Sequence, residues 1–218
     1  MSDPTRPCRA AILISGGGTN LQAFIDAVAA ETVELDIALV LSNRADAYGL
    51  ERAGRAGIPT ACIEHTAFDD RESFDRAMAG RIDGENVDVI VLAGFMRILS
   101  RWFVRRYEGR VLNIHPALLP KYPGLDTHRR VLAAGDAEHG STVHFVTEEL
   151  DGGPRILAGR LRIRDGESAD ELMHRVQALE HVIYPRAAQL FATGRIRFED
   201  GRTLLDGKPL PEPLIDDF

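Results

Sequence analysis

The first half of the chain repeats one pattern, in which a short apolar run is followed by a turn and then by a segment with helical spacing. Apolar runs occupy residues 10–14, 35–41, 60–63, 87–93 and 110–114, and helices are expected over 19–30, 47–56, 70–82 and 100–107. Strands that alternate with helices form a right-handed, mostly parallel sheet with helices on both faces. The sequence therefore predicts an α/β fold built on a single open, twisted, Rossmann-like sheet.

The second half departs from that pattern. Residues 142–146 and 156–163 are expected to pair as antiparallel strands, and residues 195–205 to form a final hairpin. Helices are expected over 127–134 and 169–193, the second with Pro185 inside it, and the tail, 206–218, is expected to be irregular. Antiparallel strands are therefore predicted to extend the sheet in the C-terminal half.

Charge and cysteine content narrow the function classes. The chain has 218 residues, with 26 Lys and Arg against 33 Asp and Glu, a net charge of −7 that argues against nucleic acid or an anionic membrane as partner. Cys8 and Cys62 form no metal-type pair, and a cytoplasmic protein is expected. Residues 1–9 are polar and contain proline, so no signal peptide is expected, and no apolar run approaches the ~20 residues that span a bilayer.

A glycine loop joins the first strand to the first helix. Backbone N–H groups of Gly18, Thr19 and Asn20 at a helix N-terminus suit a phosphate, and Thr19 and Gln22 have the spacing of a capping box. A tight turn without a ligand is the alternative. The loop lacks the Gly-Lys-Ser/Thr of a Walker A motif. It also lacks the dinucleotide-binding motif G-x-G-x-x-G, because Leu21 stands at the position of the last glycine. A site for a single phosphate is therefore predicted rather than a site for a dinucleotide.

Polar residues end the fifth strand. Asn113 and His115 are two residues apart and therefore face the same side of a strand, and Pro116 prevents the strand from continuing. Asp151 follows on a Gly-rich turn. These three groups suffice for acyl transfer. The amide can donate a hydrogen bond to an oxyanion, the imidazole can act as acid or base, and the carboxylate is a charge that adjusts the pKa of the imidazole. A structural histidine and an Asp that only holds a turn are the alternatives.

The position of these residues predicts a common site. In parallel sheets, ligands bind at the carboxyl ends of the strands, so the glycine loop, residues 94–97 and residues 113–116 should converge on one cleft. Arg97 is either an anion-binding residue or a surface charge, and an exposed helical Glu is the ordinary interpretation of Glu180. His115, His128, His139 and His144 match no metal spacing, so no metal is expected.

Several motifs together resemble one family. They are Ile14-Ser-Gly-Gly-Gly-Thr-Asn-Leu-Gln22, Ser42-Asn-Arg44, Leu92-Ala-Gly-Phe-Met-Arg-Ile-Leu99, Asn113-Ile-His-Pro116, Lys121-Tyr-Pro-Gly124, His139-Gly-Ser-Thr-Val-His144 and Asp151-Gly-Gly153. In these the chain resembles the phosphoribosylglycinamide formyltransferases from about residue 10 to 205. The resemblance implies transfer of a formyl group from 10-formyltetrahydrofolate to the amine of glycinamide ribonucleotide in purine biosynthesis.

The resemblance also implies a role for individual residues. Asn113, His115 and Asp151 match the catalytic trio; Gly18, Thr19, Asn20 and Glu180 match the ribonucleotide site; and Arg71, Met96, Arg97, Ile98, Leu99 and Asn113 match the folate side. It implies a single domain over 1–218, with a phosphate-binding half over about 9–110, a catalytic and folate-binding half over about 111–205 and a tail. It leaves a homodimer open.

Two departures and two rival activities accompany the resemblance. Asp126 stands where many relatives have His or Ala, and Arg155 where an aliphatic residue is usual. Methionyl-tRNA formyltransferase is expected to be longer, with a basic C-terminal domain, and formyltetrahydrofolate hydrolase to have an added N-terminal domain. A non-catalytic folate-binding module is the rival from another class. The complete acid–base set favours the transferase.

Overall fold

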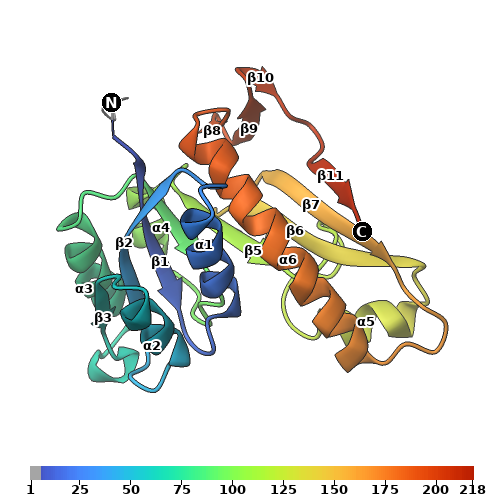
Figure 1. Ribbon diagram of the computed structural model, residues 1–218, viewed down its shortest axis with the longest axis horizontal. Helices are drawn as coiled ribbons and strands as arrows, with labels where there is room; N and C mark the ends of the chain where they lie inside the picture. The colour runs from blue at the N-terminus through green and yellow to red at the C-terminus, as the bar shows by residue number, and fades with distance from the viewer. Residues whose placement is uncertain (1–5) are drawn as a thin grey trace.

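The computed structural model describes residues 6–218 and has one large sheet through its centre (Figure 1). Among the described residues this sheet has eight strands in the order β11-β7-β6-β5-β4-β1-β2-β3. Their bounds are β1 Cys8–Ile14, β2 Leu35–Ser42, β3 Thr60–Cys62, β4 Val89–Leu92, β5 Val111–His115, β6 Glu138–Phe145, β7 Arg155–Arg162 and β11 Leu214–Asp217. Only β6 runs against its neighbours, so the predicted mostly parallel sheet with antiparallel pairing in the C-terminal half is confirmed.

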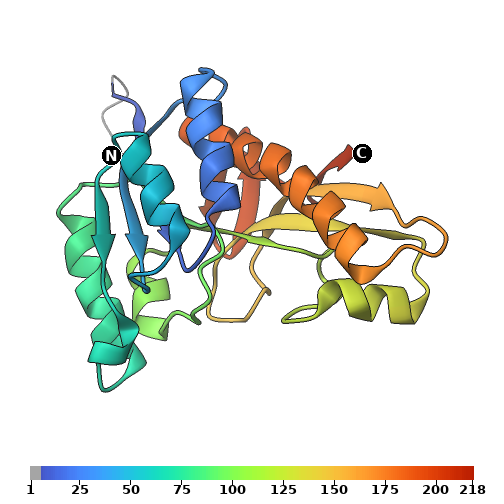
Figure 2. The same ribbon diagram turned by 60° about the horizontal axis from the view of Figure 1, so that its bottom comes forward.

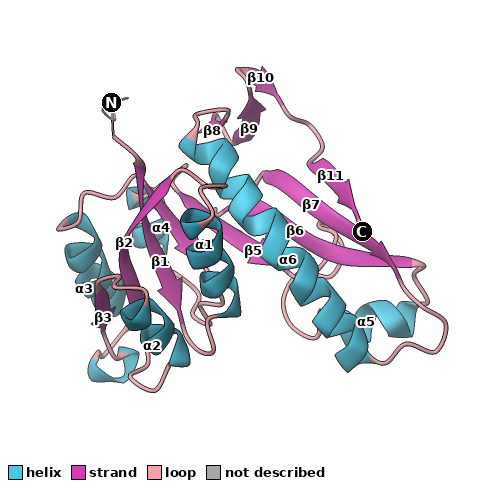
Figure 3. Cartoon of the chain, viewed as in Figure 1, coloured by secondary structure: helices cyan, strands magenta, loops and turns pink. Residues whose placement is uncertain are grey.

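Helices cover both faces of the sheet (Figures 1 and 2). Helices α1 and α6 pack together on one face, and α3 and α4 pack together on the other. Helix α6 continues past Pro185 without a break (Figure 3). The bounds are α1 Thr19–Ala29, α2 Tyr48–Arg55, α3 Arg71–Asp83, α4 Arg101–Arg106, α5 Thr127–Ala134 and α6 Ala169–Ala192, with a short 3₁₀ turn, η1, at His65–Ala67.

Strand β1 explains why the central strands are continuously apolar. Ala10, Ile12 and Ile14 belong to the core beneath α1 and α6, whereas Ala11 and Leu13 belong to the core beneath α3 and α4. All five side chains are fully buried. Because alternate residues of a strand face opposite sides, a strand covered on both faces needs apolar residues at every position.

The start of helix α1 differs from the prediction. No side-chain capping bond is present, and the capping box expected from Thr19 and Gln22 is therefore wrong. Gly18 is the N-cap residue, with φ 69°, and Thr19 already lies in the helix. A Cβ atom on Gly18 would lie 2.7 Å from the Cα atom of Gly49, so glycine is required both by the backbone conformation and by the close approach of α2.

The C-terminal tail also differs from the prediction. The hairpin of β8, Ile196–Glu199, and β9, Arg202–Leu205, is confirmed, but the following residues are not irregular. Strand β10, Lys208–Pro209, pairs with β9, and β11 pairs in parallel with β7. The prolines of the tail argued against strands, yet proline is tolerated where a strand lies at the edge of a sheet.

Two expectations concern the ends of the chain and membranes. The expectation that residues 1–9 are not a signal peptide falls partly on residues 1–5, which lie outside the described residues. Among the helices formed by residues 6–218, none combines the length and the apolar character needed to cross a membrane.

Candidate active site

The carboxyl ends of β1, β4 and β5 converge on one cleft, as predicted. Its volume is about 460 Å³. The glycine loop, the loop after β4, the end of β5 and helices α5 and α6 all contribute to it. The lining residues are Ser15, Gly16, Gly17, Gly18, Thr19, Asn20, Ala93, Gly94, Met96, Ile114, Pro116, His128, Met173, Val176, Gln177 and Glu180.

His115 and Asp151 lie within direct reach of each other. The Nδ1 atom of His115 is 3.3 Å from Oδ2 of Asp151, and both side chains are more than nine-tenths buried. The same carboxylate oxygen accepts a hydrogen bond of 2.9 Å from the backbone N–H of Gly124. Asp151 has φ 52°, a left-handed conformation that Asp tolerates better than most residues. The β6–β7 connection therefore holds this carboxylate against His115.

The second ring nitrogen of His115 is also occupied. Its Nε2 atom is 2.8 Å from the carbonyl oxygen of Tyr122, in the loop before α5. Both ring nitrogens thus face oxygen atoms that only accept hydrogen bonds. An imidazolium, with an N–H at each nitrogen, satisfies this arrangement fully.

The strand places Asn113 and His115 on the opposite side from the cleft. Ile114 and Pro116 line the cleft, whereas Asn113, His115 and Asp151 are not among its lining residues. Because alternate residues of a strand face opposite sides, Ile114 takes the cleft side and its two neighbours take the other. His115 and Asp151 therefore meet on the other side of β5 from the cleft that the glycine loop lines.

His144 is a member of the site that the sequence did not single out. Strands β5 and β6 pair Asn113 with His144, and Asn113 Nδ2 is 3.2 Å from His144 Nε2. The Nδ1 atom of His144 lies 2.9 Å from the carbonyl oxygen of Phe145, so Nδ1 is the donor and Nε2 accepts from Asn113. Burial lowers the pKa of His144 and keeps the ring neutral. The neutral ring fixes the orientation of the Asn113 amide.

Helix α6 holds the glycine loop through side chains. Asn20 donates a hydrogen bond of 3.0 Å to Glu180, and Gln177 donates one of 3.0 Å to the Thr19 hydroxyl. Glu180 is only 8% exposed, so the ordinary interpretation as an exposed helical glutamate is wrong. The Oδ1 atom of Asn20 is buried without a hydrogen-bond partner, which leaves one acceptor of the loop available to a ligand.

The hydrogen bonds of Ser141 favour a protonated Glu180. The Ser141 hydroxyl lies 2.7 Å from the carbonyl oxygen of His115 and 2.9 Å from Oε1 of Glu180. The hydroxyl has one proton, so both contacts are satisfied only when Glu180 is itself protonated and donates to Ser141. Burial raises the pKa of Glu180, and hydrogen bonding with Asn20 and Ser141 only partly opposes this.

Replacing Glu180 with glutamine should stabilise the protein at high pH. The folded state raises the pKa of Glu180 above its ordinary value of 4.5, so the stability that its neutral form provides is present below that value and is lost as the pH rises through the folded pKa. At about pH 8, E180Q should have a Tm roughly 2–4 °C above that of the native protein. The difference should disappear near about pH 4.

Thermal unfolding monitored by circular dichroism at both pH values measures this effect. Glu108→Gln, at an exposed side chain, is the matched control and should leave Tm unchanged at both. An E180Q Tm shift that is the same at both pH values would show that Glu180 ionises without cost in the folded protein.

The loop after β4 presents the residues that the resemblance places on the folate side. Met96 and Ile98, two residues apart in this loop, are apolar side chains that are 75% and 58% exposed. Burial raises the pKa of Asp75, while a bond from Ser100 and the charges of Arg71 and Arg97 oppose the rise. Both arginines therefore lie near one carboxylate, although they are 26 positions apart in the chain (97 − 71). Leu99 is half-buried against the core beneath α3 and α4.

Two further histidines form a neutral pair at the cleft, where His128 is a lining residue. His139 Nε2 is 3.1 Å from His128 Nδ1, and burial lowers the pKa of both, to about 4 for His139. Neutral imidazoles can share a single proton between facing nitrogens. Within the described part of the chain, no three His, Cys, Asp or Glu side chains are grouped as metal ligands.

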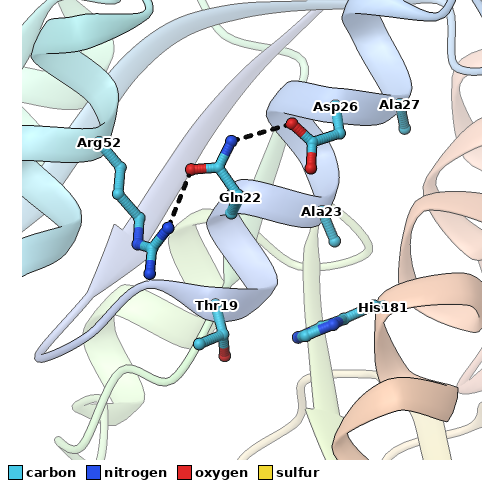
Figure 4. A pocket seen from close by; sticks show the side chains of 7 residues that line it. All are labelled: Thr19, Gln22, Ala23, Asp26, Ala27, Arg52 and His181. Carbon is cyan, nitrogen blue, oxygen red and sulfur yellow. Dashed lines mark hydrogen bonds between the residues drawn. The ribbon is translucent and has the colours of Figure 1, made fainter.

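A second cavity lies on the other side of Thr19 (Figure 4). Its volume is about 470 Å³, and it is lined by Thr19, Gln22, Ala23, Asp26, Ala27, Arg52 and His181. Gln22 accepts a bond of 3.1 Å from Arg52 and donates one of 2.9 Å to Asp26. Arg52 also donates to the carbonyl oxygen of Gly17 at 2.8 Å, so it supports the glycine loop from outside. Consecutive residues of α6, Glu180 and His181, thus line different cavities.

The two departures from the family pattern lie just before α5 and at the start of β7. Asp126 is exposed, precedes α5 and has φ 57° without a side-chain capping bond. Arg155 donates a bond of 2.8 Å to the carbonyl oxygen of Leu119 and pairs with Glu212 at 3.1 Å. Arg155 therefore joins the loop after β5 to the C-terminal tail.

Comparison with known proteins identifies the class to which this fold and site belong. Residues 8–188 match the family described as formyl transferase, and the chain belongs to that family. Phosphoribosylglycinamide formyltransferase from Escherichia coli (strain K12) is 54% identical over 200 residues, which are 92% of this chain and 94% of that protein. Within the family, the chain belongs with the phosphoribosylglycinamide formyltransferases.

Solved structures agree with this assignment. The phosphoribosylglycinamide formyltransferase of Coxiella burnetii has a TM-score of 0.91 and 49% identity, with 96% of this chain and all of that chain covered (100%). Glycinamide ribonucleotide transformylase 1 of Symbiobacterium toebii has a TM-score of 0.89 and 42% identity, with 93% and 95% covered.

Proposed function

We propose that this protein transfers the formyl group of 10-formyltetrahydrofolate to the amine of glycinamide ribonucleotide in purine biosynthesis, in the cytoplasm. The observation that carries the proposal is the contact of 3.3 Å between His115 and Asp151. His115 is two residues after Asn113 and lies on the same side of β5. Membership of the family supports the identity of the formyl donor and of the acceptor. The arrangement of the described residues supports the mechanism.

The ribonucleotide phosphate would bind at the glycine loop. Gly18, Thr19 and Asn20 stand at the N-terminus of α1, where free N–H groups and the helix dipole favour an anion. Glu180 and the unpaired Oδ1 of Asn20 provide polar groups for the rest of that substrate.

The folate would bind along the loop after β4. Met96 and Ile98 offer exposed apolar surface, and Arg71 and Arg97 offer positive charge to the acidic end of the folate. Asn113, on β5, would lie between the two bound substrates. No metal is needed for this arrangement.

The reaction would proceed by direct attack. The neutral amine attacks the formyl carbon, and Asn113 and protonated His115 donate hydrogen bonds to the resulting oxyanion. The bond between the formyl carbon and the folate nitrogen then breaks, while the amine proton passes through water and Asp151 to that nitrogen. No covalent intermediate with the protein forms.

The loop before α5 would have to move for this step. The Nε2 atom of His115 bonds to the carbonyl oxygen of Tyr122 and cannot donate to a formyl oxygen at the same time. His115 also lies on the other side of β5 from the cleft residue Ile114. We therefore propose that folate binding displaces Tyr122 and opens His115 to the reacting carbon.

The test follows the absorbance of 10-formyltetrahydrofolate with and without glycinamide ribonucleotide. The transferase predicts loss of the formyl group only when the ribonucleotide is present. Loss without an acceptor would identify a hydrolase, and binding without any loss would identify a non-catalytic module. Either result would refute the proposed function.

A further inference from the structure

Ser15 makes the contact between the two loops that serve the two proposed substrates. It is the residue after β1, it begins the glycine loop and it is only 6% exposed. Its hydroxyl lies 2.8 Å from the backbone nitrogen of Met96, in the loop after β4, and 2.6 Å from Oδ1 of Asn43, which follows β2. One hydroxyl therefore touches segments that follow three adjacent strands.

The direction of these hydrogen bonds is determined by chemistry. The amide oxygen of Asn43 can only accept, so the single proton of Ser15 is donated to it. The backbone N–H of Met96 then donates to the Ser15 oxygen. Asn43 is 3% exposed, and its Nδ2 lies 3.1 Å from Nδ1 of His65, on the side of the amide away from Ser15. The Ser15 proton is thus committed inside the protein and is not available to a ligand.

Other connections between the two loops are sparse. The backbone bond of 2.9 Å from Ala93 to Leu13 ends the ladder between β4 and β1. Beyond it, within residues 6–218, the Ser15–Met96 bond is the one hydrogen bond that links residues 15–20 to residues 94–99. A shift of one loop that moves Ser15 must therefore move Met96 or break this partly buried hydrogen bond.

We propose that Ser15 is a positioning residue that couples acceptor binding to donor binding. The proposal deepens the proposed function and rests on it for the identity of the two ligands. A phosphate that orders the glycine loop fixes Ser15, Ser15 fixes the backbone of Met96, and the folate loop is then ordered before the folate arrives. By thermodynamic linkage, the folate strengthens phosphate binding by the same factor.

The experiment is a pair of calorimetric titrations on the full chain. Tetrahydrofolate is titrated with and without saturating glycinamide ribonucleotide, and the ratio of the two Kd values is the coupling factor. The native protein should bind tetrahydrofolate about 5-fold or more tightly when the ribonucleotide is present. Ser15→Ala should reduce this factor to about 1, because the hydroxyl that joins the loops is absent.

Ser42→Ala is the matched control. Ser42 is a fully buried serine at the end of β2, and its hydroxyl bonds to the backbone of Arg44. It should keep the native coupling factor, although it too loses a buried hydroxyl. Ser15→Cys, with nearly the same volume and a weaker hydrogen-bonding group, should give an intermediate factor and serves in place of Ser15→Ala if that variant does not fold.

Three results would overturn the proposal: a native factor near 1, a native factor kept by Ser15→Ala or Ser15→Cys, or an equal loss in Ser42→Ala. Binding titrations do not require turnover. Native formyl transfer without coupling would refute only the role of Ser15, whereas absence of transfer by the native protein would refute the proposed function.

Discussion

Replacing His115 with alanine is expected to lower kcat by at least about 10²-fold, the effect of losing one acid–base group. His115 is 6% exposed, faces Asp151 through one nitrogen and follows the amide of Asn113 on the same side of β5. In the proposed reaction it donates to the oxyanion, a charge that exists only after the amine has attacked. The variant should therefore lose kcat while its KM for the ribonucleotide changes little.

The measurement is the initial rate of formyl transfer at saturating concentrations of both substrates. His174→Ala removes an imidazole from an exposed position of α6 and should keep native turnover. Near-native kcat in His115→Ala would remove His115 from the catalytic trio.

Replacing Asp151 with asparagine should also lower kcat by at least about 10²-fold. The substitution is chosen because the backbone of Asp151 is left-handed, with φ 52°, a conformation that Asn adopts readily and Ala does not. The amide oxygen of Asn can still accept from the N–H of Gly124. What is lost is the negative charge beside His115 and the base that receives the amine proton.

Asp126→Asn provides the control for this variant. Asp126 is also left-handed, with φ 57°, and lies in the loop that covers His115, but it is exposed and makes no capping bond. It should keep a kcat close to that of the native protein. Equal losses of kcat in both variants would attribute the effect to the loop and not to the charge of Asp151.

Much of the fold follows from patterns that are local in sequence. The apolar runs of β1, β4 and β5 and the side-chain caps of Asp70 and Ser100 are each visible within a few residues. The resemblance to the family, and no local pattern, predicts that His115 and Asp151 act together, because these residues are distant in the chain. The register that brings His144 beside Asn113 depends on pairing between strands, which no local pattern specifies.

Burial explains the remaining differences. Glu180 is one polar residue on a long helix, and its sequence neighbours do not show that α6 turns this position onto Asn20 and Ser141. Likewise, the spacing of Thr19 and Gln22 suits a cap, but the approach of Gly49 to Gly18 starts the helix one residue earlier. In both cases a contact distant in sequence overrides a local preference.

Strand β11 forms one edge of the large sheet. It is short, it contains Asp216 and Asp217, and those carboxylates pair with Arg186 and Arg160. Short, charged edge strands discourage one sheet from adding to another. Its neighbour in the sheet, β7, has eight residues and includes the buried apolar run Ile156, Leu157 and Ala158. Removing residues 211–218 would expose that longer apolar strand as the new edge, and self-association into aggregates would be its consequence.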